Sequence, residues 1–171
     1  MCIRDSFIMI FAPIFSALWI WMGRRNIEPS APLKFSAALA LIGAGFLVLN
    51  LGVPVATAGM MPAIFLAMLY LLHTLGELAL SPVGLSLVTK LSPAKVVGFM
   101  MGFWFLSSSI AHQAGKWISK FTAVDGADAT AEQTLALSLK VFNQVGFFAL
   151  GSAVVLLVLS PILTKWMHGV K

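Results

Sequence analysis

Five long apolar blocks set the strongest limit on how this chain folds. They cover residues 7–22, 33–51, 61–90, 94–119 and 138–165. The hydrocarbon core of a bilayer is about 30 Å thick, and a helix needs about 20 apolar residues to cross it. We therefore expect an all-α, polytopic membrane protein with about five transmembrane helices.

Composition supports a membrane location for these blocks. The chain is 60% hydrophobic and 10% charged, whereas soluble domains carry about 25% charged residues. A soluble helical core would need polar faces on most helices, and these blocks lack such faces. The single cysteine, Cys2, excludes an intrachain disulfide.

The net charge of +5 does not predict a nucleic-acid partner, because the basic residues gather at the ends of the apolar blocks. With five spans, one membrane face receives seven basic residues and the other receives three. Because cytoplasmic loops carry the excess of Lys and Arg, we expect a multi-pass protein of the plasma (inner) membrane with a cytoplasmic C-terminus. The seven are Arg24, Arg25, Lys34, Lys90, Lys95, Lys165 and Lys171; the three are Lys116, Lys120 and Lys140.

Residues 1–6, MCIRDS, are an atypical start for a membrane helix because Arg4 and Asp5 directly precede the first block. We interpret them as a truncated or non-native beginning. An odd number of spans that enters from the outside also predicts that further helices precede this chain.

The most informative residue is Glu77, the sole acidic residue between Pro29 and Val124. A carboxylate at the centre of a span costs about 2.5–3.5 kcal/mol on insertion scales. Residues of this kind usually face a bundle interior or a water-filled path. We expect Glu77 to bind substrate; the alternative is a hydrogen bond to a neighbouring helix.

Ser81 and Trp104 are the other candidate substrate-binding residues. Ser81 follows Glu77 by four residues and shares its helix face. Glu77 lies 13 residues before Lys90, and Trp104 lies 11 residues after Pro93, or about 20 Å and 17 Å of helix. A helical hairpin would thus place Glu77 and Trp104 at similar depth, where they could hold an organic cation. The alternatives are a Trp104 that packs or faces lipid, and a Ser81 bonded to its own backbone.

Gly76, Pro82 and Gly84 predict a bend in the same helix, because proline removes a backbone hydrogen bond and glycine loosens the helix. Bent helices near the midplane mark binding sites and gates in transporters, so these three residues are candidate hinges. His73 could relay protons to Glu77, although an interhelical hydrogen bond is the simpler interpretation.

Two local patterns concern helix ends and packing. Thr130 and Gln133 fit a capping box that opens the last helix or a short lead-in to it. Ser36, Ala40 and Ala44 recur every four residues, a spacing of small residues that lets helices approach closely in lipid.

Two long motifs resemble the C-terminal part of the proton-dependent oligopeptide transporters, the POT or PTR family of the major facilitator superfamily. They are YLLHTLGELALSPVGLSLVTKLSP at residues 70–93 and GFMMGFWFLSSSIAHQAG at residues 98–115. Supporting matches are FIMIFAPIFSALW, KFSAALALIGAGFLVL and LSPILTKWMHG, at residues 7–19, 34–49 and 159–169.

The resemblance implies that the five spans are helices eight to twelve of a twelve-helix transporter, most of its C-terminal bundle. It implies that Glu77 receives the N-terminal amine of a peptide, that Ser81 belongs to the same motif, and that Trp104 lines the cavity. It also implies that the hairpin at residues 62–115 bends to close the cytoplasmic gate.

Some family features have no counterpart here. The cavity asparagine that precedes the APIF-type segment would fall within MCIRDS, which does not fit. The proton-coupling carboxylates of the first and seventh helices, the arginine of the first, and the partners of the peptide carboxylate are absent from this sequence. We therefore do not expect these residues to transport anything alone.

The expected function is proton-coupled symport of di- and tripeptides, with no catalysis, no metal site and no cofactor besides the proton gradient. The expected partners are small peptides, protons, the lipid bilayer and the missing N-terminal helices, with no nucleic acid. Two alternatives stay open: a family member that moves nitrate or a drug-like solute, and a non-transporting membrane scaffold. Glu77 suits a cationic amine better than nitrate, and a scaffold would have no water-accessible cavity around Glu77 and Trp104.

Overall fold

The computed structural model describes residues 2–25, 27, 29–57, 59–122 and 130–167. Five α-helices account for most of them, as the sequence predicted. They are α1 (Cys2–Arg24), α2 (Ala31–Gly52), α3 (Ala63–Leu91), α4 (Val97–Thr122) and α5 (Ala131–Trp166), with a short 3-10 helix, η1 (Val53–Val55), after α2. Lys171, which was counted among the basic residues of one membrane face, lies outside the described residues.

Four helices are long and apolar enough to cross a membrane by themselves, within the described residues: α1, α2, α3 and α5. The fifth, α4, has 26 residues, which is long enough, but its second half is more polar than a span of lipid-facing residues. That half contains Ser107, Ser108, Ser109, His112, Gln113, Lys116 and Lys120.

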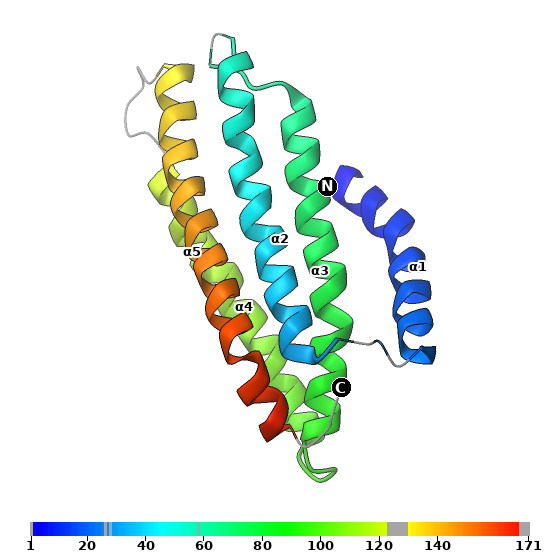
Figure 1. Cartoon of the computed structure of the whole chain (residues 1–171). Helices are drawn as coiled ribbons and strands as arrows, with labels where there is room; N and C mark the ends of the chain where they lie inside the picture. The colour runs from blue at the N-terminus through cyan, green and yellow to red at the C-terminus, as the bar shows by residue number, and fades with distance from the viewer. Residues whose placement is uncertain (1, 26, 28, 58, 123–129, 168–171) are drawn as a thin grey trace.

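The helices α5, α2, α3 and α1 stand side by side in that order, and α4 crosses behind α5 and α2 (Figure 1). Successive helices run in opposite directions, so the α1–α2 and α3–α4 connections and the end of α5 share one end of the bundle (Figure 1). Lys34, Lys90 and Lys165 lie near that end, whereas Lys120 and Lys140 lie toward the other. This agrees with the sorting of basic residues expected from the sequence.

The most closely packed contact is between α2 and α5. A Cβ on Gly43 would lie 2.9 Å from the carbonyl oxygen of Gly146, so the two backbones cross without room for a side chain. The buried Ser36 hydroxyl donates to the carbonyl of Ala153 at 2.8 Å. Of the predicted stripe of small residues, Ser36 is buried, whereas Ala40 and Ala44 are half-buried.

An amide pair also joins α2 to α5. Asn50 Nδ2 donates to Asn143 Oδ1 at 2.6 Å, and Asn143 Nδ2 donates to Asn50 Oδ1 at 3.0 Å. Each amide thus satisfies the other where lipid offers no water to do so. The sequence analysis did not single out these two asparagines, although an amide within an apolar span is itself a signal.

The start of α5 has the predicted capping box. The Thr130 hydroxyl accepts a hydrogen bond from the Gln133 backbone N–H, and the Gln133 side chain accepts one from the Thr130 N–H. The helix therefore begins at Ala131, and this part of the prediction is confirmed.

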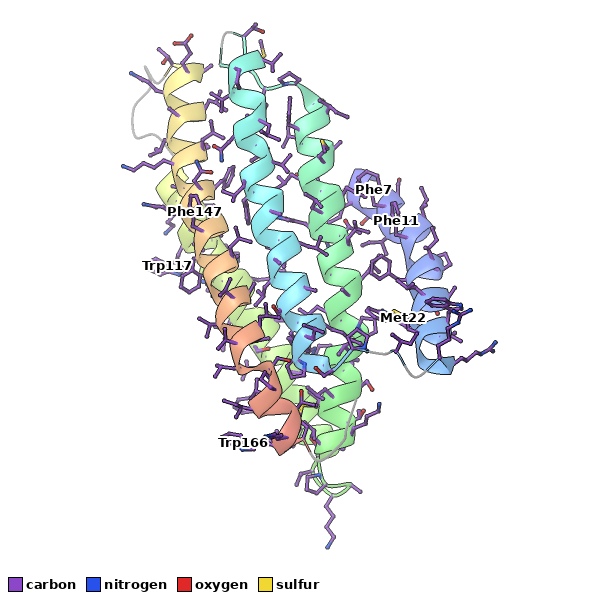
Figure 2. All side chains as sticks on the ribbon, in the orientation of Figure 1. Phe7, Phe11, Met22, Trp117, Phe147 and Trp166 are labelled. Carbon is purple, nitrogen blue, oxygen red and sulfur yellow. The ribbon has the colours of Figure 1, made fainter. Side chains whose placement is uncertain are left out.

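Large apolar side chains cover the outside of the bundle. Figure 2 shows Trp117, Phe147 and Trp166 projecting from its outer side, and they are 60%, 64% and 74% exposed. Exposure of this kind would be unfavourable in water but is ordinary for a surface that faces lipid or further helices.

Candidate functional site

Glu77 lies on the open side of α3. The side of this helix away from Glu77 buries Gly76 and Ala79, and Gly76 faces α2, where its Cβ would meet the carbonyl of Ala38 at 3.0 Å. Glu77 is exposed. Within the described residues it forms no hydrogen bond or ion pair, so the alternative of a structural bond to a neighbouring helix does not hold there.

Ser81 is also exposed, one turn along the same face. Many hydroxyls of this chain bond to a carbonyl of their own helix, for example Thr74 to Tyr70 and Ser152 to Phe148. Ser81 makes no such bond within the described part of the chain. In this conformation the Ser81 hydroxyl is thus not bonded to its own helix, and its part in substrate binding stays a prediction.

Trp104 packs against α3, but closer to the hairpin than the sequence predicted. A Cβ on Gly84 would overlap Cη2 of the Trp104 ring, so the indole rests on the bare backbone of this glycine. Gly84 is seven residues beyond Glu77, or about 10 Å along the helix. The equal-depth prediction for Glu77 and Trp104 is thus wrong.

The turn between the helices explains this difference. The depth predicted for Trp104 assumed that the fourth helix begins near Pro93. In the structure Ser92 caps the end of α3, and α4 begins at Val97. Residues 94–96 form a turn, and they add less length along the bundle than the helix assumed for them. Trp104 is therefore only about two turns into α4.

The candidate hinge residues lie inside one uninterrupted helix, because α3 continues through Pro82. Gly76 allows close approach of α2, and Gly84 allows close approach of the Trp104 ring. Both glycines therefore have a packing role in this conformation. A hinge at Gly76, Pro82 and Gly84 stays a prediction.

His73 is an interhelical histidine. Its Nε2 lies 3.2 Å from the carbonyl oxygen of Ile42 on α2, and its ring meets Phe46 edge-on with the centroids 4.6 Å apart. Because a carbonyl only accepts, the Nε2–H must be the donor. This confirms the simpler interpretation of His73, which points toward α2.

One face of α3 has a column of candidate site residues, because residues three and four apart are helical neighbours. The column consists of Glu77, Ser81 and Gly84, with the Trp104 ring lying on Gly84. An open carboxylate at one end can attract a cation, a hydroxyl one turn away can donate or accept, and the aromatic ring offers a flat apolar surface. The column is therefore suited to a small molecule that is cationic at one end.

Lys34 differs from what the sequence predicted for a lysine near a helix end. It is 5% exposed, and its ammonium lies 4.6 Å from the centre of the Trp19 ring. Nothing in the local spacing of Trp19 and Lys34 shows that α1 and α2 bring the two side chains together.

The family model described as "PTR2: POT family" matches residues 2–135. The dipeptide and tripeptide permease B of Aeromonas hydrophila is 32% identical over 169 residues, which are 98% of this chain and 34% of the relative. The protein of the same name from Salmonella typhimurium is 31% identical over 167 residues, with 97% and 34% coverage. The chain thus spans about a third of the length of these curated relatives.

Two solved structures extend the likeness to the fold. The crystal structure of peptide transporter POT in complex with sulfate superimposes with a TM-score of 0.78 at 32% identity, over 95% of this chain and 30% of that one. That of a POT family transporter in complex with 5-aminolevulinic acid gives a TM-score of 0.79 at 28% identity, over 95% and 31%. With its helical, apolar bundle and a family match over most of its length, the chain is a multi-pass membrane protein that belongs to the POT family of transporters.

Proposed function

We propose that the intact protein containing this chain is a proton-coupled symporter of di- and tripeptides in the plasma membrane. In this proposal the chain supplies helices eight to twelve, and preceding helices supply the rest of the cavity and the proton-coupling groups. The relatives support the peptide substrate, since they are named dipeptide and tripeptide permeases. Their threefold greater length supports the missing helices.

The observation that carries the proposal is the exposed Glu77 carboxylate in the middle of an apolar helix, without a partner among the described residues. Such a charge is costly in a membrane, and the N-terminal ammonium group of a peptide would compensate it. Nitrate would not, because it carries the same sign of charge as Glu77.

The column along α3 supports a substrate of two or three residues. The distance along the α3 axis from Glu77 to Gly84, where the Trp104 ring lies, is about 10 Å. An extended chain spans at most about 3.3–3.6 Å per residue, so a tripeptide with its amine at Glu77 would reach the indole. Ser81 lies between them and would bond to the peptide backbone.

The α3–α4 hairpin is the candidate gate. We infer that α3 bends at Gly76, Pro82 and Gly84 when the cavity closes toward the cytoplasm. In this orientation the end of the bundle with Lys34, Lys90 and Lys165 faces the cytoplasm, as the excess of basic residues favours. The C-terminus lies on the same side.

The test is peptide uptake by the intact protein with Glu77→Gln. The substitution keeps the size of the side chain but removes its charge. Hydrogen bonds to charged groups contribute about 1.5–3 kcal/mol, so we expect kcat/KM for a dipeptide to fall by at least about tenfold. The measurement is initial uptake of a labelled dipeptide into proteoliposomes with an inward proton gradient.

Glu132→Gln is the matched control, because Glu132 is exposed in the first turn of α5 and far along the chain from the column. It should transport like the native protein. An N-acetylated dipeptide lacks the free amine that Glu77 would bind. Its uptake by the Glu77→Gln protein should therefore be little lower than its uptake by the native protein. Undiminished uptake of the free dipeptide would remove Glu77 from the proposed role.

A further inference from the structure

A cavity lies away from the Glu77 column, where α1, α2 and α3 meet near the basic end of the bundle. Its volume is about 160 Å³, and its lining includes Trp19, Ala31, Lys34, Pro82, Ser86 and Lys90. Ser86 follows Glu77 by nine residues, which places it about 180° around α3. The two sites therefore use opposite faces of the same helix.

Two lysines give the cavity its chemical character. Lys34 and Lys90 both line it, and none of the described residues that line it is acidic. Lys34 is buried, with its ammonium over the Trp19 ring. Both lysines already have an interaction of their own, but an ammonium has three N–H donors, so each has donors for an anion in addition.

Trp19 lines this cavity and also has a buried donor. Its Nε1 is enclosed and has no hydrogen-bond partner within the described residues. An indole N–H can only donate, and leaving it unpaired away from water costs free energy. A small rotation of the ring toward an anionic oxygen in the cavity would give Nε1 an acceptor, and the Ser86 hydroxyl would be a further donor.

The position of the cavity favours one kind of anion. Lys34 lies in the first turn of α2 and Lys90 in the last turn of α3, so the two lysines are at helix ends, which in a membrane span lie toward the lipid headgroups. Basic pockets between transmembrane helices on the cytoplasmic side bind anionic headgroups. We propose that this cavity binds the phosphate group of an anionic phospholipid, a site separate from the proposed peptide site and independent of it.

The test is native mass spectrometry of the intact protein with phosphatidylglycerol, and with phosphatidylcholine of the same acyl chains. A lysine near an anionic membrane surface contributes about fivefold in affinity. We therefore expect Lys90→Gln to bind phosphatidylglycerol about fivefold more weakly and phosphatidylcholine unchanged. Trp19→Phe, which keeps an aromatic side chain but removes the indole N–H, should also weaken phosphatidylglycerol binding.

Lys95→Gln is the matched control. Lys95 is an exposed lysine in the α3–α4 turn at the same end of the bundle, but it does not line the cavity. The Lys95→Gln substitution should change the affinity for phosphatidylglycerol by less than about twofold. Lys90 and Lys95 are both exposed, so neither substitution should prevent folding, which the elution profile on size exclusion checks.

Two results would overturn the proposal. Equal losses in Lys90→Gln and Lys95→Gln would show a diffuse surface attraction instead of a site, and equal binding of the two lipids by the native protein would exclude charge recognition. Competition with inorganic phosphate shows whether the cavity binds the phosphate group of a lipid or free phosphate. Displacement of the lipid by phosphate at equal concentration would overturn the lipid assignment, whereas displacement only at large excess would support it.

Discussion

The α2–α5 and α3–α4 contacts are both between neighbouring helices, but they are built differently. Between α2 and α5, glycine backbones cross at Gly43 and Gly146, and the asparagine pair adds two hydrogen bonds. Between α3 and α4, an indole rests on the backbone of Gly84. Beyond Trp104, every residue of α4 from 105 to 120 is exposed.

This difference in packing indicates that the α2–α5 contact is fixed, whereas the α3–α4 contact can change. In lipid, helices associate through close packing and interhelical hydrogen bonds, since the hydrophobic effect does not favour protein over lipid contacts. The α2–α5 contact uses both and would lose both on separation. The α3–α4 contact has less to lose, which fits the proposed role of this hairpin as the gate. Three substitutions test this comparison.

The largest effect on stability is expected for Gly43→Ala. The new methyl group would lie 2.8 Å from Leu150 Cγ and 2.9 Å from the carbonyl oxygen of Gly146, and a backbone oxygen cannot turn away. Overpacking of this kind costs about 1–3 kcal/mol. Unfolding of the intact protein in mixed micelles measures the change.

The control is Gly151→Ala on α5, where nothing lies within 4 Å of a new Cβ. It should be neutral, or stabilising by up to about 1 kcal/mol, because alanine favours helix more than glycine. Equal destabilisation by both substitutions would mean that the glycine crossing does not fix α2 against α5.

An intermediate effect is expected for Asn50→Leu. It leaves the Asn143 amide without its partner, and an unsatisfied polar group costs about 1–3 kcal/mol; hydrogen bonds within membranes lie at the lower end of such values. Asn50→Leu with Asn143→Leu should recover most of the loss, because no amide is then left alone. A double-mutant cycle on the same unfolding assay measures the coupling, and additive losses would contradict a pairwise bond.

The smallest effect on stability is expected for Gly84→Ala, below about 1 kcal/mol, because Trp104 is half-buried and α4 can shift. The shift itself should be measurable. Since the new Cβ would overlap the indole, the distance between spin labels at the exposed positions Leu85 and Phe105 should increase.

Gly102→Ala, on α4 and in open space, should leave that distance unchanged. If Gly84→Ala also leaves it unchanged, the indole does not set the spacing of the hairpin. A stability loss as large as that of Gly43→Ala would show instead that both contacts are fixed, and the contrast between them would disappear.

The sequence by itself determined which segments are helical and where the costly charge lies. The length of an apolar segment predicts a membrane-spanning helix, because in lipid the backbone N–H and C=O groups find hydrogen-bond partners only within the helix. The start of α5 at Thr130 follows from a side chain and a backbone group three residues apart. Glu77 could be singled out for the same local reason, since its cost depends on the apolar residues around it. The family resemblance, also read from the sequence, agrees with the comparisons.

Only the tertiary structure decided how the helices stand against one another. The level of Trp104 depended on how far the residues after Ser92 advance before α4 begins, and the pairing of Asn50 with Asn143 depended on the crossing of α2 and α5. The meeting of Trp19 with Lys34 likewise required α1 and α2 to fold together. Helical periodicity fixes which residues share a face of one helix, but the register between two helices is set by side chains in contact across distant parts of the chain, and no local pattern contains it.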